Sequence, residues 1–185
     1  MGTGADCRRS ERNRFRCLHE TRKKLVSATA GAVSAVEIRL RELGLTLPSV
    51  AAPVAAYVPA VITGNLVHTS GQLPFVDGAL PATGKVGATV DAGDAASYAA
   101  ICAINALAAV KAQIGDLDRI SRVVKVVGFV ASDPSFTGQP AVINGASELL
   151  GKVFGAAGQH ARSAVGVAVL PLDAPVEVEM IVEFA

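Results

Sequence analysis

The chain has 185 residues, of which 51% are apolar and none is tryptophan, and its formal net charge is +1. This length suits one domain with a sizeable core, and the composition favours a compact cytosolic protein with helices and strands over a fibrous, disordered or membrane-embedded one. The three cysteines, Cys7, Cys17 and Cys102, show no metal-ligand spacing, so we expect neither a disulfide framework nor a bound metal.

Charge is unevenly distributed along the chain. Residues 1–24 carry eight Lys and Arg against three Asp and Glu, whereas residues 25–185 carry nine against thirteen. We predict a disordered basic extension over residues 1–32 and a single domain over residues 33–185. A signal peptide is the alternative for the extension, although its apolar part is rich in Ala, Ser and Gly rather than Leu. No specific nucleic-acid partner is expected, because only the extension is basic.

The first predicted elements are a short helix and a hairpin. The helix covers residues 33–43, with Val36, Ile38 or Leu40 facing inward. A strand to Ile62, a turn over residues 63–65 and a strand over residues 66–70 then form the hairpin. The Gly-, Pro- and Asp-rich residues 77–88 read as a surface loop with a possible short strand near Lys85.

Two longer helices are predicted in the second half of the chain. Asp91 can cap a helix that runs to about Ile114, and Gly115 can end it. A strand over residues 119–131 and a second helix over residues 139–157 follow. No stretch approaches the roughly 20 apolar residues that a membrane span requires.

Two strands, over residues 163–170 and 176–184, finish the chain. On the first, alternation places valines on one face, which we expect to pack on the helices, and Arg162 with Ala164 on the other. On the second, Glu177 and two further glutamates share a face. Two helices cover only one face of such a sheet. We therefore expect the face with Arg162 and the glutamates to be buried against copies of the chain in a closed homo-oligomer.

Three stretches of the sequence resemble the YjgF/YER057c/UK114 family, also called RidA (reactive intermediate deaminase). They are AAYVPAVITGNLVHTSGQLP, ISRVVKVVGFVASDPSF, and ARSAVGVAVLP with VEVEMIVEFA, and the match covers about residues 56–184. The resemblance implies an α+β, chorismate-mutase-like fold, in which a mixed sheet carries two helices on one face and the chain forms a homotrimer with a pocket at each subunit interface. Deaminase members hydrolyse enamine and imine intermediates to 2-oxo acids and ammonia without a cofactor or metal.

The resemblance also implies roles for individual residues. Arg162 falls on the arginine that binds the substrate carboxylate, where a planar fork suits a carboxylate better than lysine does. Glu177 falls on the glutamate that would accept a proton from water or relay one to the leaving nitrogen. Further substrate-binding positions would be Tyr57, Ser70, Gly71, Asn144 and Ala164.

Ala164 departs from the family pattern, because many deaminases have cysteine there. Chemistry that needs a thiol could not survive this change, whereas a contact through the backbone carbonyl could. A non-catalytic trimer that senses 2-oxo acids is therefore a second hypothesis. A ribonuclease or translation inhibitor is a third, which the acidic balance of residues 25–185 disfavours.

Each assignment has a structural alternative. Arg162 could form an interfacial salt bridge with Glu177 or Glu179, and Asn144 could satisfy backbone groups. Tyr57 could pack its ring, and Ser70 with Gly71 could simply end the hairpin. His68 is expected at an interface, and His160, in the loop before Arg162, is not expected to act. The predicted partners are a small carboxylate-bearing metabolite and further copies of the chain, in the cytoplasm and away from membranes.

Overall fold

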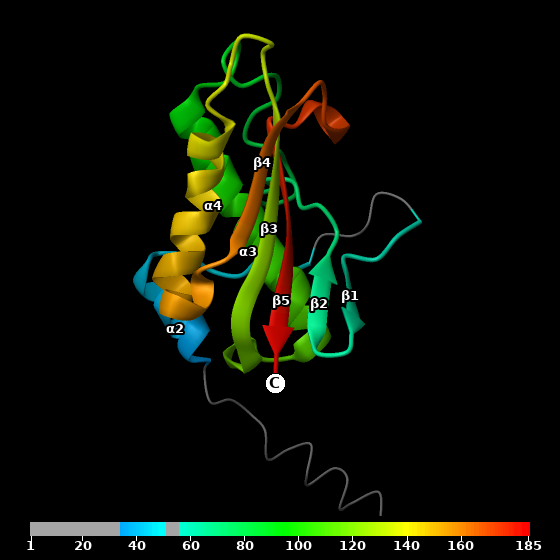
Figure 1. Cartoon of the computed structure of the whole chain (residues 1–185), viewed down its shortest axis with the longest axis vertical. Coiled ribbons are helices and arrows are strands. Elements are labelled where there is room, and N and C mark those ends of the chain that lie inside the picture. The colour runs from blue at the N-terminus through cyan, green and yellow to red at the C-terminus, as the bar shows by residue number, and fades with distance from the viewer. Residues whose placement is uncertain (1–33, 51–55) are drawn as a thin grey trace, which may run out of the picture. The chain divides into compact units, whose positions relative to one another are not determined.

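The computed structural model describes residues 34–50 and 56–185 of the chain, so the predicted basic extension over residues 1–32 lies outside the described residues. Ser34–Ala185 forms one compact unit built around a five-stranded mixed sheet (Figure 1). The strands lie in the order β1-β2-β5-β3-β4, and only β3 and β4 pair in parallel. Their bounds are β1 Ala60–Thr63, β2 Leu66–Thr69, β3 Ile120–Ala131, β4 Ala161–Val167 and β5 Val176–Phe184.

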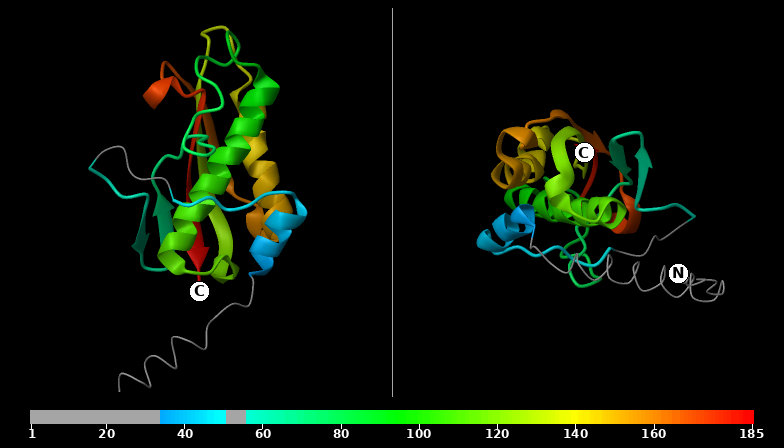
Figure 2. Two further views of the ribbon diagram at one scale, coloured as in Figure 1. Left: turned by 180° about the vertical axis from the view of Figure 1, so that it is seen from behind. Right: turned by 90° about the horizontal axis from the view of Figure 1, so that it is seen from below.

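Helix α3, Ala92–Ile114, is the long central helix and begins and ends where the sequence predicts. The Asp91 carboxylate accepts a hydrogen bond from the backbone N–H of Gly93 at 2.7 Å, which satisfies one of the free donors of the first turn. Gly115 ends the helix with φ +82°, a conformation that glycine adopts without steric cost. Figure 2 shows α3 lying across the back of the sheet.

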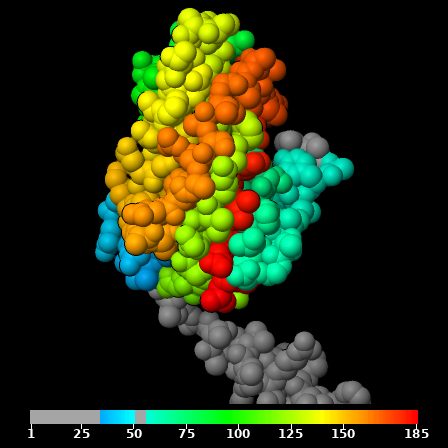
Figure 3. Space-filling view, in the orientation of Figure 1, coloured from blue at the N-terminus to red at the C-terminus, as the bar shows by residue number. Residues whose placement is uncertain are grey.

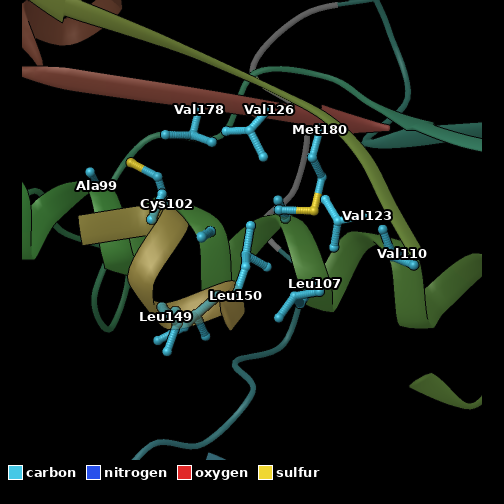
Figure 4. Packing of buried hydrophobic residues seen from close by; sticks show 14 of the residues in the cluster. Ala99, Cys102, Leu107, Val110, Val123, Val126, Leu149, Leu150, Val178 and Met180 are labelled. Atoms are coloured by element: carbon cyan, nitrogen blue, oxygen red, sulfur yellow. The ribbon is translucent and has the colours of Figure 1, made fainter. Parts of the chain in front are cut away.

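The second predicted long helix, α4, covers Gln139–Phe154, and the short helix α2 covers Ala35–Glu42. In α2, Val36 and Leu40 are buried whereas Ile38 is 42% exposed, so two of the three predicted inward positions are confirmed. The core lies between the helices and the sheet (Figure 4). It joins side chains of α3 and α4 to alternate residues of the strands, among them Cys102, Leu107, Val126, Leu150, Val178 and Met180.

No helix within residues 34–50 and 56–185 covers the other face of the sheet, and strands β4, β3 and β5 lie uncovered in the space-filling view (Figure 3). The alternation predicted along β5 is confirmed: Val176 and Val178 are buried, whereas Glu177 and Glu179 lie on the uncovered face. We call this side the open face of the sheet. The predicted α+β fold, with two long helices on one face, is confirmed.

The faces of β4 are exchanged relative to the prediction. Val165 is 44% exposed on the open face, whereas Ala164 packs against the core. In the parallel register Ala164 lies beside Gly128, and a Cβ atom at Gly128 would overlap the side chain of Ile143 in α4. Small residues here leave room for the close approach of α4. The prediction that the valines of β4 pack on the helices is therefore wrong, and Arg162 lies on the helix-covered face.

Helix α3 also departs from the prediction that no stretch resembles a membrane span. The mean hydropathy of an 18-residue stretch of this helix is 1.5, so by length and composition alone the helix could cross a membrane. However, 56% of that stretch is buried inside the domain, as in the core helix of a folded protein.

Candidate functional site

Arg162 lies near the start of the edge strand β4, where its side chain reaches α4. Its Nη1 donates to Oδ1 of Asn144 at 2.8 Å and to Oγ of Ser147 at 3.1 Å. Asn144 and Ser147 are three residues apart on α4 and therefore project from the same side of the helix. The structure thus brings together two residues expected at the site, Arg162 and Asn144, and adds Ser147.

His160 extends this group. Its Nδ1 lies 2.6 Å from the carbonyl oxygen of Gly158, and its Nε2 lies 3.0 Å from Oγ of Ser147. A carbonyl oxygen only accepts, so Nδ1 carries the proton and Nε2 of the neutral ring accepts from the Ser147 hydroxyl. We call Arg162, Asn144, Ser147 and His160 the arginine cluster. Both atoms that accept hydrogen bonds from the Arg162 guanidinium, Oδ1 of Asn144 and Oγ of Ser147, are neutral oxygens.

The charge of Arg162 has no carboxylate partner in the part of the chain that the structure describes, because no Asp or Glu oxygen there lies within 4 Å of it. Glu177 and Glu179, the salt-bridge partners considered from the sequence, lie on the open face of the sheet, opposite Arg162. Within one chain the guanidinium is therefore positioned but not neutralised. Such a cation at the edge of a sheet suits a small anion.

Glu177 forms a second group with the residues after the hairpin. It follows the first residue of β5, and Gln72 pairs with the neighbouring Val178 through two backbone hydrogen bonds. Gly71 lies so close that a Cβ atom there would overlap Oε1 of Glu177. We call Glu177, Gly71 and Ser70 the glutamate cluster. Glycine at position 71 is what lets the carboxylate lie against the backbone.

The pKa of Glu177 is raised from its ordinary value, mainly because burial disfavours the charged form, and also because Glu179 is a nearby negative charge. A carboxyl group with a raised pKa holds its proton more readily than an exposed glutamate. It is therefore better suited than an exposed glutamate to returning a proton that it has accepted.

The two clusters do not meet within one chain. Arg162 pairs in register with Val126 of β3, whereas Glu177 pairs with Phe129. Arg162 and Glu177 are therefore separated by about 10 Å along the strands, which is the length of three residues, and by about 10 Å across the sheet, which is two strand spacings. Their side chains also leave opposite faces of the sheet. A substrate that contacts both residues must lie between two copies of the chain.

Three further residues were predicted to bind substrate: Ser70, Tyr57 and Ala164. The Ser70 hydroxyl donates to the carbonyl oxygen of Val58 at 2.7 Å, so it ties the hairpin to the preceding segment and its proton is engaged. Tyr57, just before Val58, is 43% exposed. Ala164 lies on the same face of β4 as Arg162 and packs against the core.

Sequence reasoning missed Ser147 and expected no part for His160. The i, i+3 spacing of Asn144 and Ser147 on a predicted helix was a signal that both face the same neighbour. Nothing local indicates that this neighbour is Arg162, because the contact depends on how α4 packs against β4.

No group of three or more His, Cys, Asp or Glu side chains that could hold a metal ion occurs within residues 34–50 and 56–185. A separate hollow of about 200 Å³ lies between α2, residues 45–47 and Lys111 of α3, where Lys111 pairs with Glu37. It contains no residue of either cluster.

Comparison with known proteins shows the family. A family model described as "YjgF/chorismate_mutase-like, putative endoribonuclease" matches residues 37–184. The match thus begins within α2 and not near residue 56 as the three quoted stretches suggested. Protein TCP17 of Trypanosoma cruzi is 47% identical over 151 residues, which is 80% of this chain and 93% of that protein.

Two solved structures are similar over most of their length. The protein Atu1372 of Agrobacterium tumefaciens is 52% identical, with a TM-score of 0.77 over 82% of this chain and 93% of that one. A protein of Shewanella oneidensis called a putative endoribonuclease is 34% identical, with a TM-score of 0.79 over 80% and 99%.

RidA of a Psychrobacter species is a more distant match. It is 29% identical, with a TM-score of 0.53 over 74% of this chain and 94% of that protein. The family model covers the sheet, helices α3 and α4, most of α2 and both clusters. The chain therefore belongs to the YjgF/RidA family, with its chorismate-mutase-like fold.

Proposed function

We propose that this protein hydrolyses small enamine or imine intermediates to 2-oxo acids and ammonia, with the substrate carboxylate bound by Arg162. The observation that carries the proposal is the state of the Arg162 side chain: it is oriented by two neutral oxygens and has no carboxylate partner among the described residues. An oriented guanidinium with its charge available is the usual protein ligand of a carboxylate.

A relative supports an amino-acid-like ligand. TdcF of E. coli, solved with bound serine, is 27% identical, with a TM-score of 0.55 over 76% of this chain and 96% of that one. Serine carries a carboxylate next to a nitrogen-bearing carbon, as a 2-imino acid does. The proposed ligand class is therefore a small 2-imino or 2-amino acid.

The proposed reaction asks little of the protein. A protonated imine carbon is electrophilic, so water adds to it, the resulting carbinolamine releases ammonia, and a carbonyl group remains in place of the imine. Glu177 takes a proton from the attacking water and returns one to the leaving nitrogen. Arg162 holds the carboxylate so that the imine carbon lies within reach of that water.

The site that we propose lies between two chains. Arg162 of one copy and Glu177 of a second copy would contact one substrate, because the two residues leave opposite faces of the sheet within a chain. Burial of the open face and of the β4 edge in a homotrimer would bring such pairs together and cover exposed residues such as Val165. We propose a cytoplasmic location, where amino acid metabolism supplies imino acids.

The experiment generates imino acids with an amino acid oxidase and follows their disappearance with and without the protein. Wild type should accelerate hydrolysis, and Arg162→Ala should abolish the acceleration. Arg41→Ala is the matched control, because Arg41 is an exposed arginine of α2 that bonds only the backbone of its own helix. Failure of wild type to accelerate the loss of any of several imino acids would refute the deaminase function.

A second candidate function is binding of 2-oxo acids without turnover. The observation that favours it is the separation of Glu177 from Arg162 within one chain, which leaves the carboxylate-binding group without its proposed proton acceptor unless a second copy supplies it. Stabilisation by 2-oxobutanoate without hydrolysis of imino acids would support this alternative.

A further inference from the structure

The arginine cluster contains a continuous hydrogen-bond chain that ends on the backbone. It runs from Nη1 of Arg162 to Oγ of Ser147, from the Ser147 hydroxyl to Nε2 of His160, and from Nδ1 of His160 to the carbonyl oxygen of Gly158. With His160 neutral, each group in this chain donates once to the next. The chain therefore has one consistent direction.

Both hydrogens of Nη1 are used inside the protein. One goes to Asn144 and the other to Ser147, whereas Nε and Nη2 have no hydrogen-bond partner among the described residues. The Nε and Nη2 hydrogens lie along one edge of the guanidinium plane and match the two oxygens of a carboxylate. The internal bonds therefore determine which edge of Arg162 is offered to a ligand.

The elements that carry the cluster are firmly held. Ser147 follows Ala146, which is fully buried in α4, and Gly158 lies so close to α4 that a Cβ atom there would overlap the carbonyl of Leu150. The backbone oxygen at which the chain ends is thus fixed against the same helix that carries Ser147. A long arginine side chain loses conformational entropy when a ligand immobilises it. Hydrogen bonds that already hold the side chain in place reduce the entropy that ligand binding must still remove.

The geometry points to Ser147 and His160 as positioning residues that hold Arg162 in the orientation for side-on, two-point binding of a carboxylate. This inference rests on the proposed carboxylate ligand of Arg162. His160 acts only through Ser147, so the two residues form one unit. Neither touches the substrate.

The test measures the affinity of the full chain for 2-oxobutanoate by calorimetry. Ser147→Ala should weaken binding about five- to tenfold, as loss of a typical hydrogen bond does. His160→Leu should have a similar effect, and the double variant should be no weaker than Ser147→Ala alone, because the histidine acts through the serine. Ser147→Thr and His160→Gln keep the required hydroxyl and acceptor and should bind within about twofold of wild type.

Ser97→Ala is the matched control, because Ser97 is an exposed helical serine whose hydroxyl bonds only the backbone of α3. Nitrogen-15 spectra give a second readout: the two Nη resonances of Arg162 should be separate in wild type and coalesce in Ser147→Ala as the guanidinium begins to rotate. A loss of stability alone would not produce this change.

The outcomes separate this inference from the proposed function. Equal affinity of wild type and Ser147→Ala, or additive losses in the double variant, would refute the positioning role even if imino acids are hydrolysed. Weakened binding in both single variants without turnover by wild type would refute the deaminase and retain the positioning role. No binding of 2-oxobutanoate by wild type would refute both.

Discussion

Arg162 and Glu177 leave opposite faces of the sheet, separated by strand β3, with which both β4 and β5 pair. One chain therefore carries the proposed carboxylate-binding cation on its helix-covered side and the proposed proton acceptor on its open side. If both act on one substrate, the oligomer is part of the active site, and not only a means of stabilising the fold.

Glu177 should reduce stability at neutral pH. Burial first, and Glu179 second, raise its folded pKa above the unfolded value of about 4.3. Its contribution is fully present below the unfolded pKa and is lost as pH rises through the folded pKa. Thermal unfolding of Glu177→Gln should therefore show a higher Tm than wild type at pH 7, with no difference below about pH 4.

Activity of the same variant should fall about a hundredfold, the lower range of general acid–base contributions. Glu183→Gln is the control. Glu183 lies on the same face of β5, but its carboxylate accepts hydrogen bonds from the side chains of Asn65 and Ser121. A Glu177→Gln protein that is less stable than wild type at pH 7 would show that the carboxylate has a stabilising partner.

Gly71→Ala should displace the Glu177 carboxylate. The new Cβ atom would overlap Oε1 of Glu177, which lies at the movable end of a side chain, so the carboxylate should shift while the fold persists. A misplacement of about 1 Å can lower turnover roughly 10–100-fold, and we expect that loss in kcat. Gly151→Ala is the control, because the space around this helical glycine is open and alanine should slightly stabilise α4. Unchanged kcat in Gly71→Ala would argue against a catalytic Glu177.

Asp118 should anchor the start of α2. Its carboxylate accepts hydrogen bonds from the Ser34 hydroxyl at 2.6 Å and from the backbone N–H groups of Ala35 and Val36 at 2.7 and 2.9 Å. Asp118→Ala should cost about 1 kcal/mol, as loss of a helix cap does. The Tm should fall by about 2–4 °C, and amide exchange at Val36 should accelerate.

This effect should disappear in acid. Burial alone would raise the pKa of Asp118, but the hydrogen bonds from Ser34, Val36 and Ala35, with the charge of Arg39, lower it overall. The contribution is therefore present above the unfolded pKa of about 3.9 and is lost as pH falls through the lower folded pKa. A Tm difference that persists at pH 2 would mean that the neutral carboxyl group caps the helix equally well.

Ala164→Cys tests whether a thiol matters. The proposed reaction uses Arg162, Glu177 and water, so kcat/KM should change by less than about threefold. A gain of a hundredfold or more would show that the alanine had disabled a thiol-dependent site.

The sequence predicts the elements of this fold better than their contacts. Asp91 and Gly115 determine the ends of α3 because capping and termination are local effects. Alternation along β4 correctly indicates which residues share a face. It cannot tell which face the helices cover, since that depends on the parallel register with β3 and on the space left by Gly128 for Ile143.

The candidate site follows the same pattern. Resemblance to the family indicated Arg162 and Asn144, which the structure brings together, but not the contact of Ser147 with His160. That contact joins a helix to the loop before the next strand, and it depends on how α4 packs. The separation of Arg162 from Glu177 likewise became visible only once the sheet order was known.

The central claim, that one active site takes Arg162 and Glu177 from different chains, is tested most directly by mixing two inactive variants. Arg162→Ala and Glu177→Gln are unfolded together and refolded as mixed oligomers, and imino acid hydrolysis is measured. If the chains mix randomly in equal amounts, one interface in four pairs an intact Arg162 with an intact Glu177, so about a quarter of wild-type activity should return. Mixed oligomers that remain as inactive as either variant alone would contradict the account.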